Sequence, residues 1–277
     1  MDEKTLVQIA IIGCGWLGLP LGLSLQKSGH RIVATVRSEA GCAKIRSLGI
    51  TCLQFELGDT LTNEKFVPIF NSDLLILNIP VGRNTTSSEK FSANMGGLLR
   101  QAADSNIKQV IFVSTTSVYG DQDTIISEKS PTIPSTQSGK INLAIEQLVQ
   151  QYFAKQACII RPVGLVGEDR HPAHFLAGKT KLAAPNKLVN LIHQHDVIQC
   201  IESIIKNETW GHILVLSASE HPTRKDYYTW AAKHLNLTAP SFVEEQGQPS
   251  GKLIDASKSL AILSINLKYP SPYDMLN

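Results

Sequence analysis

The feature that most constrains this 277-residue chain lies near its N-terminus, where a short apolar run leads into three glycines. The run VQIAIIG (7–13) is followed by Cys14-Gly15-Trp16-Leu17-Gly18, and the next residues have the apolar spacing of a helix. In a strand–loop–helix of this kind, the first glycine permits a tight turn and the third lets helix and strand pack closely. The pattern predicts the first β–α unit of a parallel sheet.

Further strands are expected along the first half of the chain, and helical patterns separate them. The runs are rich in Val, Ile and Leu with little alternation, which is typical of strands covered on both faces. Six strands alternating with helices predict an α/β fold with a Rossmann-like, doubly wound parallel sheet. After the run at 7–13, these strands are expected at 30–37, 51–57, 72–80, 109–115 and 156–167.

The pattern becomes looser after residue 167. The segment 167–187 mixes Gly, Pro and cations without a clear period. It is followed by a helix expected near 194–206, a strand at 212–218 and a helix at 224–237. We therefore expect a Rossmann domain over 1–167 and a small mixed C-terminal lobe over 168–277. Whether the two interleave is left open.

Composition argues against several classes of partner. A net charge of +2 gives no reason to expect a nucleic acid or a membrane surface, and no apolar run reaches the roughly 18 residues of a span. The acidic N-terminus does not resemble a signal peptide. The five cysteines are scattered without a CxxC pair, which favours reduced thiols in a cytoplasmic protein and no metal site. The oligomeric state is left open.

The glycine loop also predicts a ligand. A bare Gly15 lets the backbone approach a pyrophosphate, and free N–H groups at the start of the helix face its negative charge. Trp16 is expected to cover the loop or the neighbouring cleft, and a packing role alone explains it equally well. The expected dinucleotide-binding residues of the loop are Gly13, Gly15, Trp16, Leu17 and Gly18.

The end of the second strand indicates which dinucleotide is bound. NAD enzymes place Asp or Glu there to hold the ribose 2′-hydroxyl, but this chain has Arg37-Ser38. A guanidinium and a hydroxyl suit a 2′-phosphate, so NADP is favoured, with NAD as the alternative. Because ligands of such sheets lie at the carboxyl ends of the strands, Asp59 is expected near the adenine and Asn78 and Pro80 beside the same crevice.

Later segments carry a family resemblance. IFVSTTSVYGDQ (111–122), RPVGLVG (161–167), NLIHQHDV (190–197) and GKLIDASKSLAIL (251–263), with the glycine loop upstream, resemble the extended short-chain dehydrogenase/reductases of the sugar-nucleotide epimerase/dehydratase family. The resemblance implies an oxidoreductase or epimerase in which Thr115 is the catalytic hydroxyl. Ser114, at the same strand end, is expected among the cofactor-binding residues. His193 is expected to be structural, because His195 does not share its helical face.

One family motif is replaced. The family carries Tyr-x-x-x-Lys at the start of a helix, whereas PSTQSGKINLAIEQLV (134–149) offers Ser138 and Asn142 on one face, followed by Glu146. Ser135 is expected to cap this helix. A serine hydroxyl is a far weaker acid than a phenol tuned by lysine. With GCGWLGLPLG and RPVGLVGEDRHPAHFLAGK, the chain resembles the YeeZ-like group of atypical extended reductases, which also lacks this Tyr and Lys.

Two interpretations of the function remain open. In the first, an NADP-dependent oxidoreductase or epimerase-like enzyme takes its proton from Ser138, from Tyr119 of the VYG, from His171 or from water. In the second, the chain binds the dinucleotide without catalysis, and cofactor occupancy sets its affinity for a partner. The segment after the sixth strand predicts a clamp for a small anionic substrate, or else a solvated loop, and its cations are Arg170, His171, His174 and Lys179.

Overall fold

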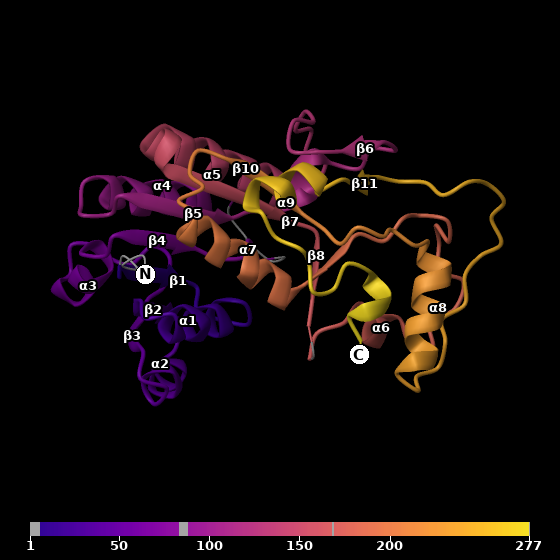
Figure 1. Ribbon diagram of the computed structural model, residues 1–277, viewed down its shortest axis with the longest axis horizontal. Helices are drawn as coiled ribbons and strands as arrows, with labels where there is room; N and C mark the ends of the chain where they lie inside the picture. Colours follow the sequence, from indigo (N-terminus) through magenta and orange to yellow (C-terminus); the bar gives the residue numbers. More distant parts are fainter. Residues whose placement is uncertain (1–5, 83–87, 168, 277) are drawn as a thin grey trace.

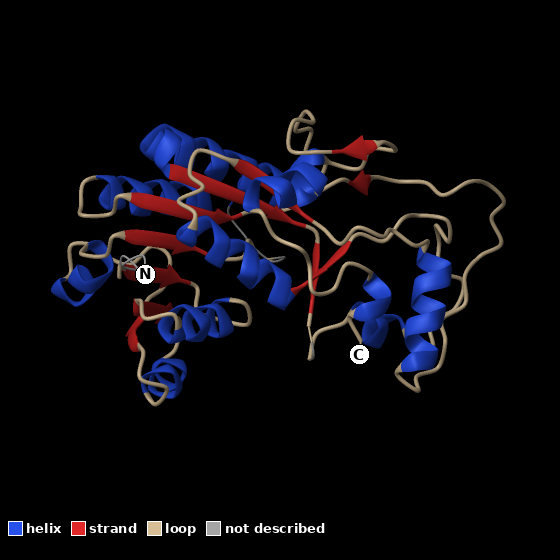
Figure 2. Ribbon diagram, in the orientation of Figure 1, coloured by secondary structure: helices blue, strands red, loops and turns tan. Residues whose placement is uncertain are grey.

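The computed structural model describes residues 6–82, 88–167 and 169–276, and within these ranges seven parallel strands form one central sheet (Figures 1 and 2). The strand order is β10-β7-β5-β4-β1-β2-β3. The chain winds outward in opposite directions from β1 and β4, which makes the ends of these two strands a topological switch point. The doubly wound parallel sheet is thus confirmed. Its strands are β1 (Gln8–Ile12), β2 (Arg31–Val36), β3 (Thr51–Gln54), β4 (Leu74–Leu77), β5 (Gln109–Val113), β7 (Ala157–Pro162) and β10 (Ile213–Leu216).

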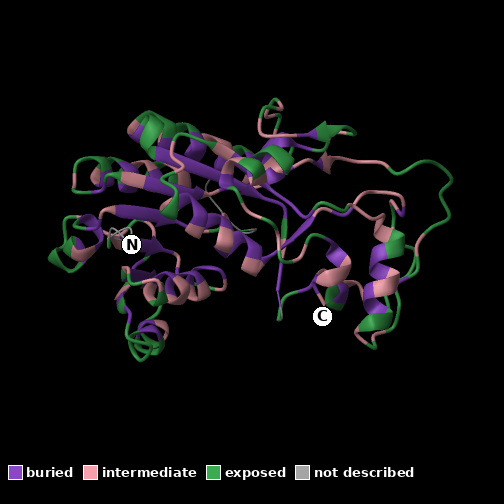
Figure 3. Ribbon diagram, viewed as in Figure 1, coloured by how far each residue is buried: buried purple, intermediate pink, exposed green. Residues whose placement is uncertain are grey.

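Helices cover both faces of the sheet, so the strands form the buried middle layer (Figure 3). Successive side chains of a strand point to opposite faces: Ile9 and Ile11 of β1 pack with one helical layer, Ala10 and Ile12 with the other. This two-sided burial explains the continuous apolar runs. One layer contains α1 (Gly18–Lys27), α2 (Glu39–Arg46), α7 (Gln194–Lys206) and α9 (Ser257–Leu263); the other contains α3 (Val67–Phe70), α4 (Ser88–Ala103) and α5 (Gln137–Phe153).

The strand expected at 212–218 lies in the central sheet and not in the C-terminal lobe. It contains β10, whose Ile213 is paired in parallel with Ile159 of β7. Helix α7, which precedes β10 in the chain, packs against α1, and the later helix α9 packs against β10 itself. The chain therefore leaves the sheet after β7 and returns to it, so residues on both sides of 167 build the sheet.

The second lobe is small and rich in aromatic side chains. Its elements are α6 (Pro172–Leu176), α8 (Arg224–His234), and the paired strands β8 (Gly164–Val166) and β9 (Leu191–His193). The short strands β6 (Ile125–Ile126) and β11 (Leu253–Ile254) form a separate parallel pair. Tyr227 and Tyr228 of α8 are buried in the lobe's own core, so this lobe supplies a wall built on packed aromatics.

Helix α5, which carries Ser138 and Asn142 in place of the family's Tyr and Lys, begins one residue later than predicted. Thr136, not Ser135, is the N-cap, and its hydroxyl accepts a hydrogen bond of 3.1 Å from the amide of Gly139. The predicted Ser135 cap is therefore wrong, because either neighbouring hydroxyl satisfies the sequence rule and only the backbone geometry selects one.

Nowhere in the described ranges is a helix both long and apolar enough to cross a bilayer.

Candidate cofactor and substrate site

A cleft of about 1600 Å³ opens at the carboxyl ends of the strands, around the switch point. The β1–α1 loop, the ends of β2 to β5, the start of α5 and the segment after β7 all contribute to its lining. The structure thus brings together most of the residues singled out from the sequence. Those that line the cleft are Gly13, Gly15, Trp16, Leu17, Arg37, Ser38, Asn78, Pro80, Ser114, Thr115, Ser138 and Arg170.

The glycine loop is held by close backbone contacts. A Cβ atom on Gly13, which has a φ of +94°, would lie 2.4 Å from the carbonyl oxygen of Asn78, and one on Gly18 would lie 2.6 Å from that of Gly13. Asn78 Nδ2 donates to the Gly13 carbonyl at 3.0 Å. Gly15 differs, because a Cβ there would meet no atom within 4 Å. The loop is therefore tight beneath and open toward the cleft, which fits a pyrophosphate at the start of α1.

The ends of β2 and β3 form the other end of the cleft. Ser38 caps α2, since its Oγ accepts from the Gly41 amide at 3.2 Å, and the neighbouring Arg37 side chain is exposed. Glu56 also lines the cleft. Glu56 is not singled out by the sequence, because it falls inside the strand expected at 51–57, whereas β3 ends at Gln54.

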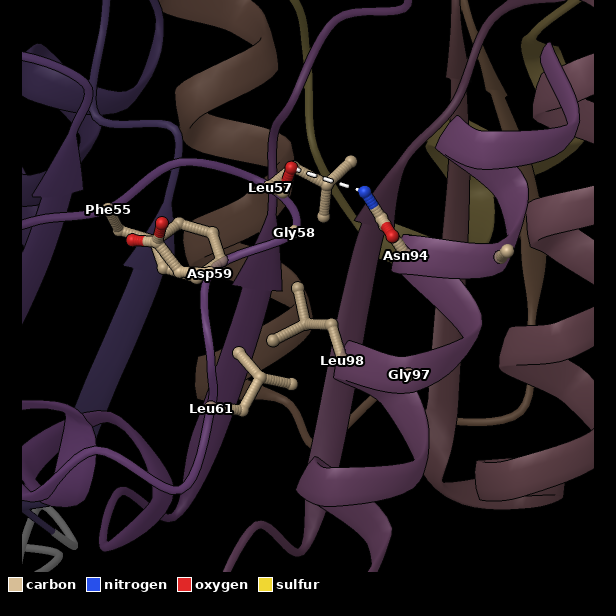
Figure 4. Close-up of a pocket in the computed structure, with 9 residues that line it drawn as sticks. Phe55, Leu57, Gly58, Asp59, Leu61, Asn94, Gly97 and Leu98 are labelled. Atoms are coloured by element: carbon tan, nitrogen blue, oxygen red, sulfur yellow. Dashed lines mark hydrogen bonds between the residues drawn. The ribbon is translucent and has the colours of Figure 1, made fainter. Parts of the chain in front are cut away.

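Asp59 does not line the large cleft. Its Oδ2 accepts from the backbone amide of Glu56 at 3.2 Å, so it holds the turn that presents Glu56. The side chain borders a separate pocket of about 140 Å³ between this turn and α4, shown in Figure 4. There Asn94 Nδ2 donates to the Leu57 carbonyl at 3.3 Å, which ties α4 to the turn.

Trp16 joins the glycine loop to the second lobe. Its Nε1 donates to the Asp169 carboxylate at 2.6 Å, and the Arg170 guanidinium lies 4.9 Å from its ring centroid. A Cβ on Gly167 would lie 2.8 Å from the same ring. On the backbone side, Gln194 Nε2 donates to the Trp16 carbonyl at 2.7 Å. Trp16 is thus a contact between two parts of the chain as well as a lining residue.

The carboxyl end of β5 meets the start of α5. Thr115 Oγ1 accepts from the Ser117 amide at 3.1 Å and donates to Ser117 Oγ at 3.1 Å, which caps the 3₁₀ turn Thr116–Tyr119. Ser138 and Asn142 line the cleft one helical turn apart, and Asn142 Nδ2 donates to the Ser138 carbonyl at 2.8 Å. This edge therefore offers neutral hydroxyl and amide groups to a ligand.

Tyr119 points away from the cleft. Its ring is fully buried, and Arg161 Nη1 donates to its hydroxyl at 2.7 Å. Burial raises the pKa of the phenol, and the nearby guanidinium offsets this only in part. The role suggested for Tyr119 as a proton donor thus has no geometric support, because the hydroxyl lies inside the protein.

The predicted cluster of cations is dispersed. His171 is buried and caps α6, with Nδ1 accepting from the Ala173 amide at 3.1 Å and Nε2 lying 2.8 Å from the Tyr227 hydroxyl. Burial, with the charge of His174, lowers the pKa of His171 to about 4, so it is neutral at pH 7. His174 and Lys179 are exposed and do not line the cleft. Of these four residues, only Arg170 lines the cleft.

Other family-like segments have structural roles. His193 Nδ1 accepts from the His195 amide at 3.1 Å and caps α7, which confirms the structural role expected for His193. Asp196 is buried and accepts from the backbone amide of Lys268. Lys252 Nζ donates to the carbonyls that bracket the VYG turn, those of Thr116 (3.0 Å) and Gly120 (2.8 Å).

The charged residues of the cleft lining are mostly cations. Arg37, Arg170 and Lys90 of α4 contribute positive charge and Glu56 contributes negative charge. Such a balance favours an anionic ligand. No sequence signal identifies Lys90, since it lies in a helical pattern without a motif. Among the residues that the structure describes, no group of three or more His, Cys, Asp or Glu side chains is arranged to hold a metal ion.

Comparison with known proteins decides the family. A family model for the NAD dependent epimerase/dehydratase family matches residues 9–204. The chain belongs to this epimerase/dehydratase family. Protein YeeZ of Escherichia coli K12 is 32% identical over 270 residues, which cover 97% of this chain and 98% of YeeZ. This match confirms the resemblance to the YeeZ-like group.

Solved structures share the fold at lower identity. The Bordetella bronchiseptica enzyme WbmG, in complex with NAD, matches with a TM-score of 0.82 and 16% identity, over 100% of this chain and 93% of WbmG. UDP-glucuronic acid 4-epimerase of Bacillus cereus, also in complex with NAD, matches with a TM-score of 0.77 and 18% identity, over 97% and 96%. The fold that these two structures share with the chain therefore includes the second lobe.

The loop geometry predicts that alanine substitutions of two glycines in this loop will differ in their effect on stability. Gly13→Ala should lower the free energy of unfolding by more than about 2 kcal/mol, because the added methyl group collides with the Asn78 carbonyl at a positive φ. Gly15→Ala should change it by less than about 0.5 kcal/mol, since the position is open. Urea denaturation of both variants measures the difference. Equal effects would contradict the geometry of the loop.

The buried His171 predicts a dependence of stability on pH. Its pKa is about 4 in the folded chain and about 6.5 unfolded, so below pH 6.5 the unfolded chain binds more protons and stability falls toward pH 4. Between pH 7.5 and 5, this histidine should contribute a loss on the order of 2 kcal/mol. His171→Asn, which retains a capping side chain, should flatten that part of the urea-derived profile. The exposed His212→Asn is the control; a similar slope in wild type and His171→Asn would contradict the assignment.

Proposed function

We propose that the protein binds NADP(H) in the cleft and acts as an oxidoreductase or epimerase-like enzyme on a small anionic substrate. The observation that carries the proposal is the glycine loop, which is packed tightly below Gly13 and Gly18 and open at Gly15. Residues 13–18 would hold the pyrophosphate through backbone N–H groups at the start of α1. WbmG and the Bacillus cereus epimerase, which share this fold, are complexes with NAD.

The preference for NADP rests on the end of β2. Arg37 is exposed, lines the cleft and stands where a carboxylate would favour NAD. Its guanidinium would pair with a 2′-phosphate through charge-assisted hydrogen bonds, and the Ser38 hydroxyl, adjacent in the chain, would add a further contact. NAD is the alternative cofactor at the same site.

At the edge of the cleft formed by the end of β5 and the start of α5, catalysis would depend on neutral side chains. When bound, the nicotinamide cofactor supplies hydride transfer. Thr115, Ser138 and Asn142 would orient a substrate carbonyl or hydroxyl by hydrogen bonds, and Ser138, which is half-buried, would pass a proton between substrate and solvent. Without the phenol and lysine of the family motif, general acid–base catalysis would be weaker by a factor of roughly 10² to 10⁴.

The substrate would be a small anion, since Arg170 and Lys90 add positive charge to the cleft wall. The net charge of +2 is too small to suggest a nucleic-acid or membrane partner. A cytoplasmic setting accords with the five free, buried cysteines.

One observation favours a second candidate, a non-catalytic dinucleotide sensor. The titratable side chains of the described cleft lining are Cys14, Arg37, Glu56, Lys90 and Arg170. None of these lies on β5 or α5, and burial raises the pKa of Cys14 to about 12. In this alternative, cofactor occupancy would set the affinity for a partner.

Cofactor choice is tested by titrating NADPH and NADH into wild type and Arg37→Ala. Loss of the phosphate contact should weaken NADPH binding by about 1.5–3 kcal/mol and leave NADH binding nearly unchanged. Lys44→Ala, which removes an exposed cation from α2 outside the cleft, is the matched control. Tighter binding of NADH by wild type, with no loss in Arg37→Ala, would reject the assignment to NADP.

Catalysis is tested by following NADPH absorbance at 340 nm across a panel of anionic aldehydes, ketones and keto sugars. Gly15→Val, whose side chain would fill the pyrophosphate space, is the control without cofactor. If turnover is found, Ser138→Ala should lower the rate by roughly 10²; an unchanged rate would assign the proton to solvent. Tight NADPH binding without turnover on any compound would favour the sensor.

A further inference from the structure

A buried polar network lies directly beneath the cleft, outside the family motif. The carboxylate of Glu146, on α5, accepts from Arg161 of β7 through Nε (3.0 Å) and Nη2 (2.5 Å). Ser114 Oγ, at the end of β5, donates to the same carboxylate at 2.5 Å. The remaining guanidinium nitrogen of Arg161, Nη1, donates to the Tyr119 hydroxyl at 2.7 Å. Arg161 opens the family-like segment RPVGLVG and Glu146 follows Ser138 and Asn142 on the same helix, but the sequence predicts no role for either.

Chemistry fixes the direction of the bonds in this network. A guanidinium has only donors and an ionised carboxylate only acceptors, so Arg161 donates to Glu146. The Ser114 hydroxyl donates its own hydrogen to Glu146 Oε1, the oxygen that also accepts from Arg161 Nε. Glu146 and Arg161 are only 2% and 4% exposed, and therefore solvent does not compete for these bonds.

Ser114 is the member of the network that reaches the cleft. It is in the cleft lining, whereas Tyr119, Glu146 and Arg161 are not. With its hydrogen turned inward to Glu146, Ser114 presents only oxygen lone pairs to the cleft. A ligand group that meets Ser114 must therefore be a hydrogen-bond donor, and an acceptor there would face unfavourable lone-pair repulsion.

We propose that Glu146 and Arg161 are positioning residues that fix Ser114 as a hydrogen-bond acceptor for the nicotinamide half of the bound dinucleotide. The inference rests on the proposed function, since it requires a bound cofactor. Arg37 and Ser114 lie on opposite sides of the switch point, at the ends of β2 and β5. A dinucleotide that spans the crevice with its adenosine at Arg37 brings its nicotinamide half toward β5. Donors in that half are the carboxamide N–H and the ribose hydroxyls.

The network suits specificity better than stability. A buried ion pair gives little net stability over apolar residues of similar size, because desolvation offsets the attraction. Its effect here is to remove the rotational freedom of one hydroxyl at the ligand surface. Fixing that hydroxyl in advance avoids an ordering cost on binding and penalises ligands of the wrong hydrogen-bond polarity.

The test compares NADP⁺ with its deamido analogue, nicotinic acid adenine dinucleotide phosphate, in which an acceptor replaces the carboxamide donor. A second arm compares NADP⁺ with analogues that lack one hydroxyl of the nicotinamide ribose. The variants are Ser114→Ala and a triple change that replaces the network by apolar residues, Tyr119→Phe with Glu146→Leu and Arg161→Met. Tyr119→Phe alone is the matched control, because it leaves the Ser114–Glu146 bond in place.

Wild type should prefer NADP⁺ by about tenfold or more over one class of analogue, which identifies the donor group. Ser114→Ala and the triple variant should reduce that preference to about threefold or less, and Tyr119→Phe should retain it. A merely structural network would change all dissociation constants together and leave their ratio unchanged. If the triple variant does not fold, Ser114→Ala, which keeps the ion pair, decides the outcome.

The inference is overturned if wild type prefers neither class, or if Ser114→Ala retains the full preference. A wild type that binds neither NADP(H) nor NAD(H) rejects the proposed function and the inference with it. The two failures are distinct, because only the second abolishes saturable dinucleotide binding.

Discussion

The structure depends on how closely β1 and β4 approach where the sheet reverses its winding. Backbone atoms of Gly13 and Asn78 meet there at a distance that excludes a side chain, and the Asn78 amide bonds the Gly13 carbonyl. This contact fixes the start of α1 against the neighbouring strand end. The cleft exists because the two strands then lead their loops apart. The residues that line it come from many elements, but they all depend on this junction for their position.

Local patterns allowed most of the sheet to be predicted, and non-local contacts account for the errors. Strands buried on both faces leave continuous apolar runs, and a strand–loop–helix leaves its glycines. β10 belongs to the sheet because it pairs with β7, where Ile213 lies opposite Ile159. These two residues are some fifty positions apart, so no local sequence pattern indicates the pairing. The same limit applies to His171, whose sequence neighbours suggest a cation cluster. Its burial against Tyr227 is a property of the folded lobe.

The epimerase/dehydratase family supplies a fold without settling the chemistry on it. Ser138 and Asn142 lie on the cleft side of α5, and the phenol of Tyr119 is turned inward to Arg161. The tyrosine of the VYG motif therefore packs in the protein interior and does not line the cleft. What this site offers a ligand is mostly polarity and charge fixed by the surrounding structure, with little titratable chemistry at the β5–α5 edge.

The contact between Trp16 and Gly167 has a consequence for how such a chain changes over generations. The indole ring occupies the space that any side chain at position 167 would need, and a smaller residue at position 16 would leave that space empty. The two positions lie about 150 residues apart in the sequence, and Asp169, the hydrogen-bond partner of Trp16, is 153 residues from it. A substitution at one therefore alters which substitutions the other tolerates. This epistasis links the history of the glycine loop to that of the second lobe.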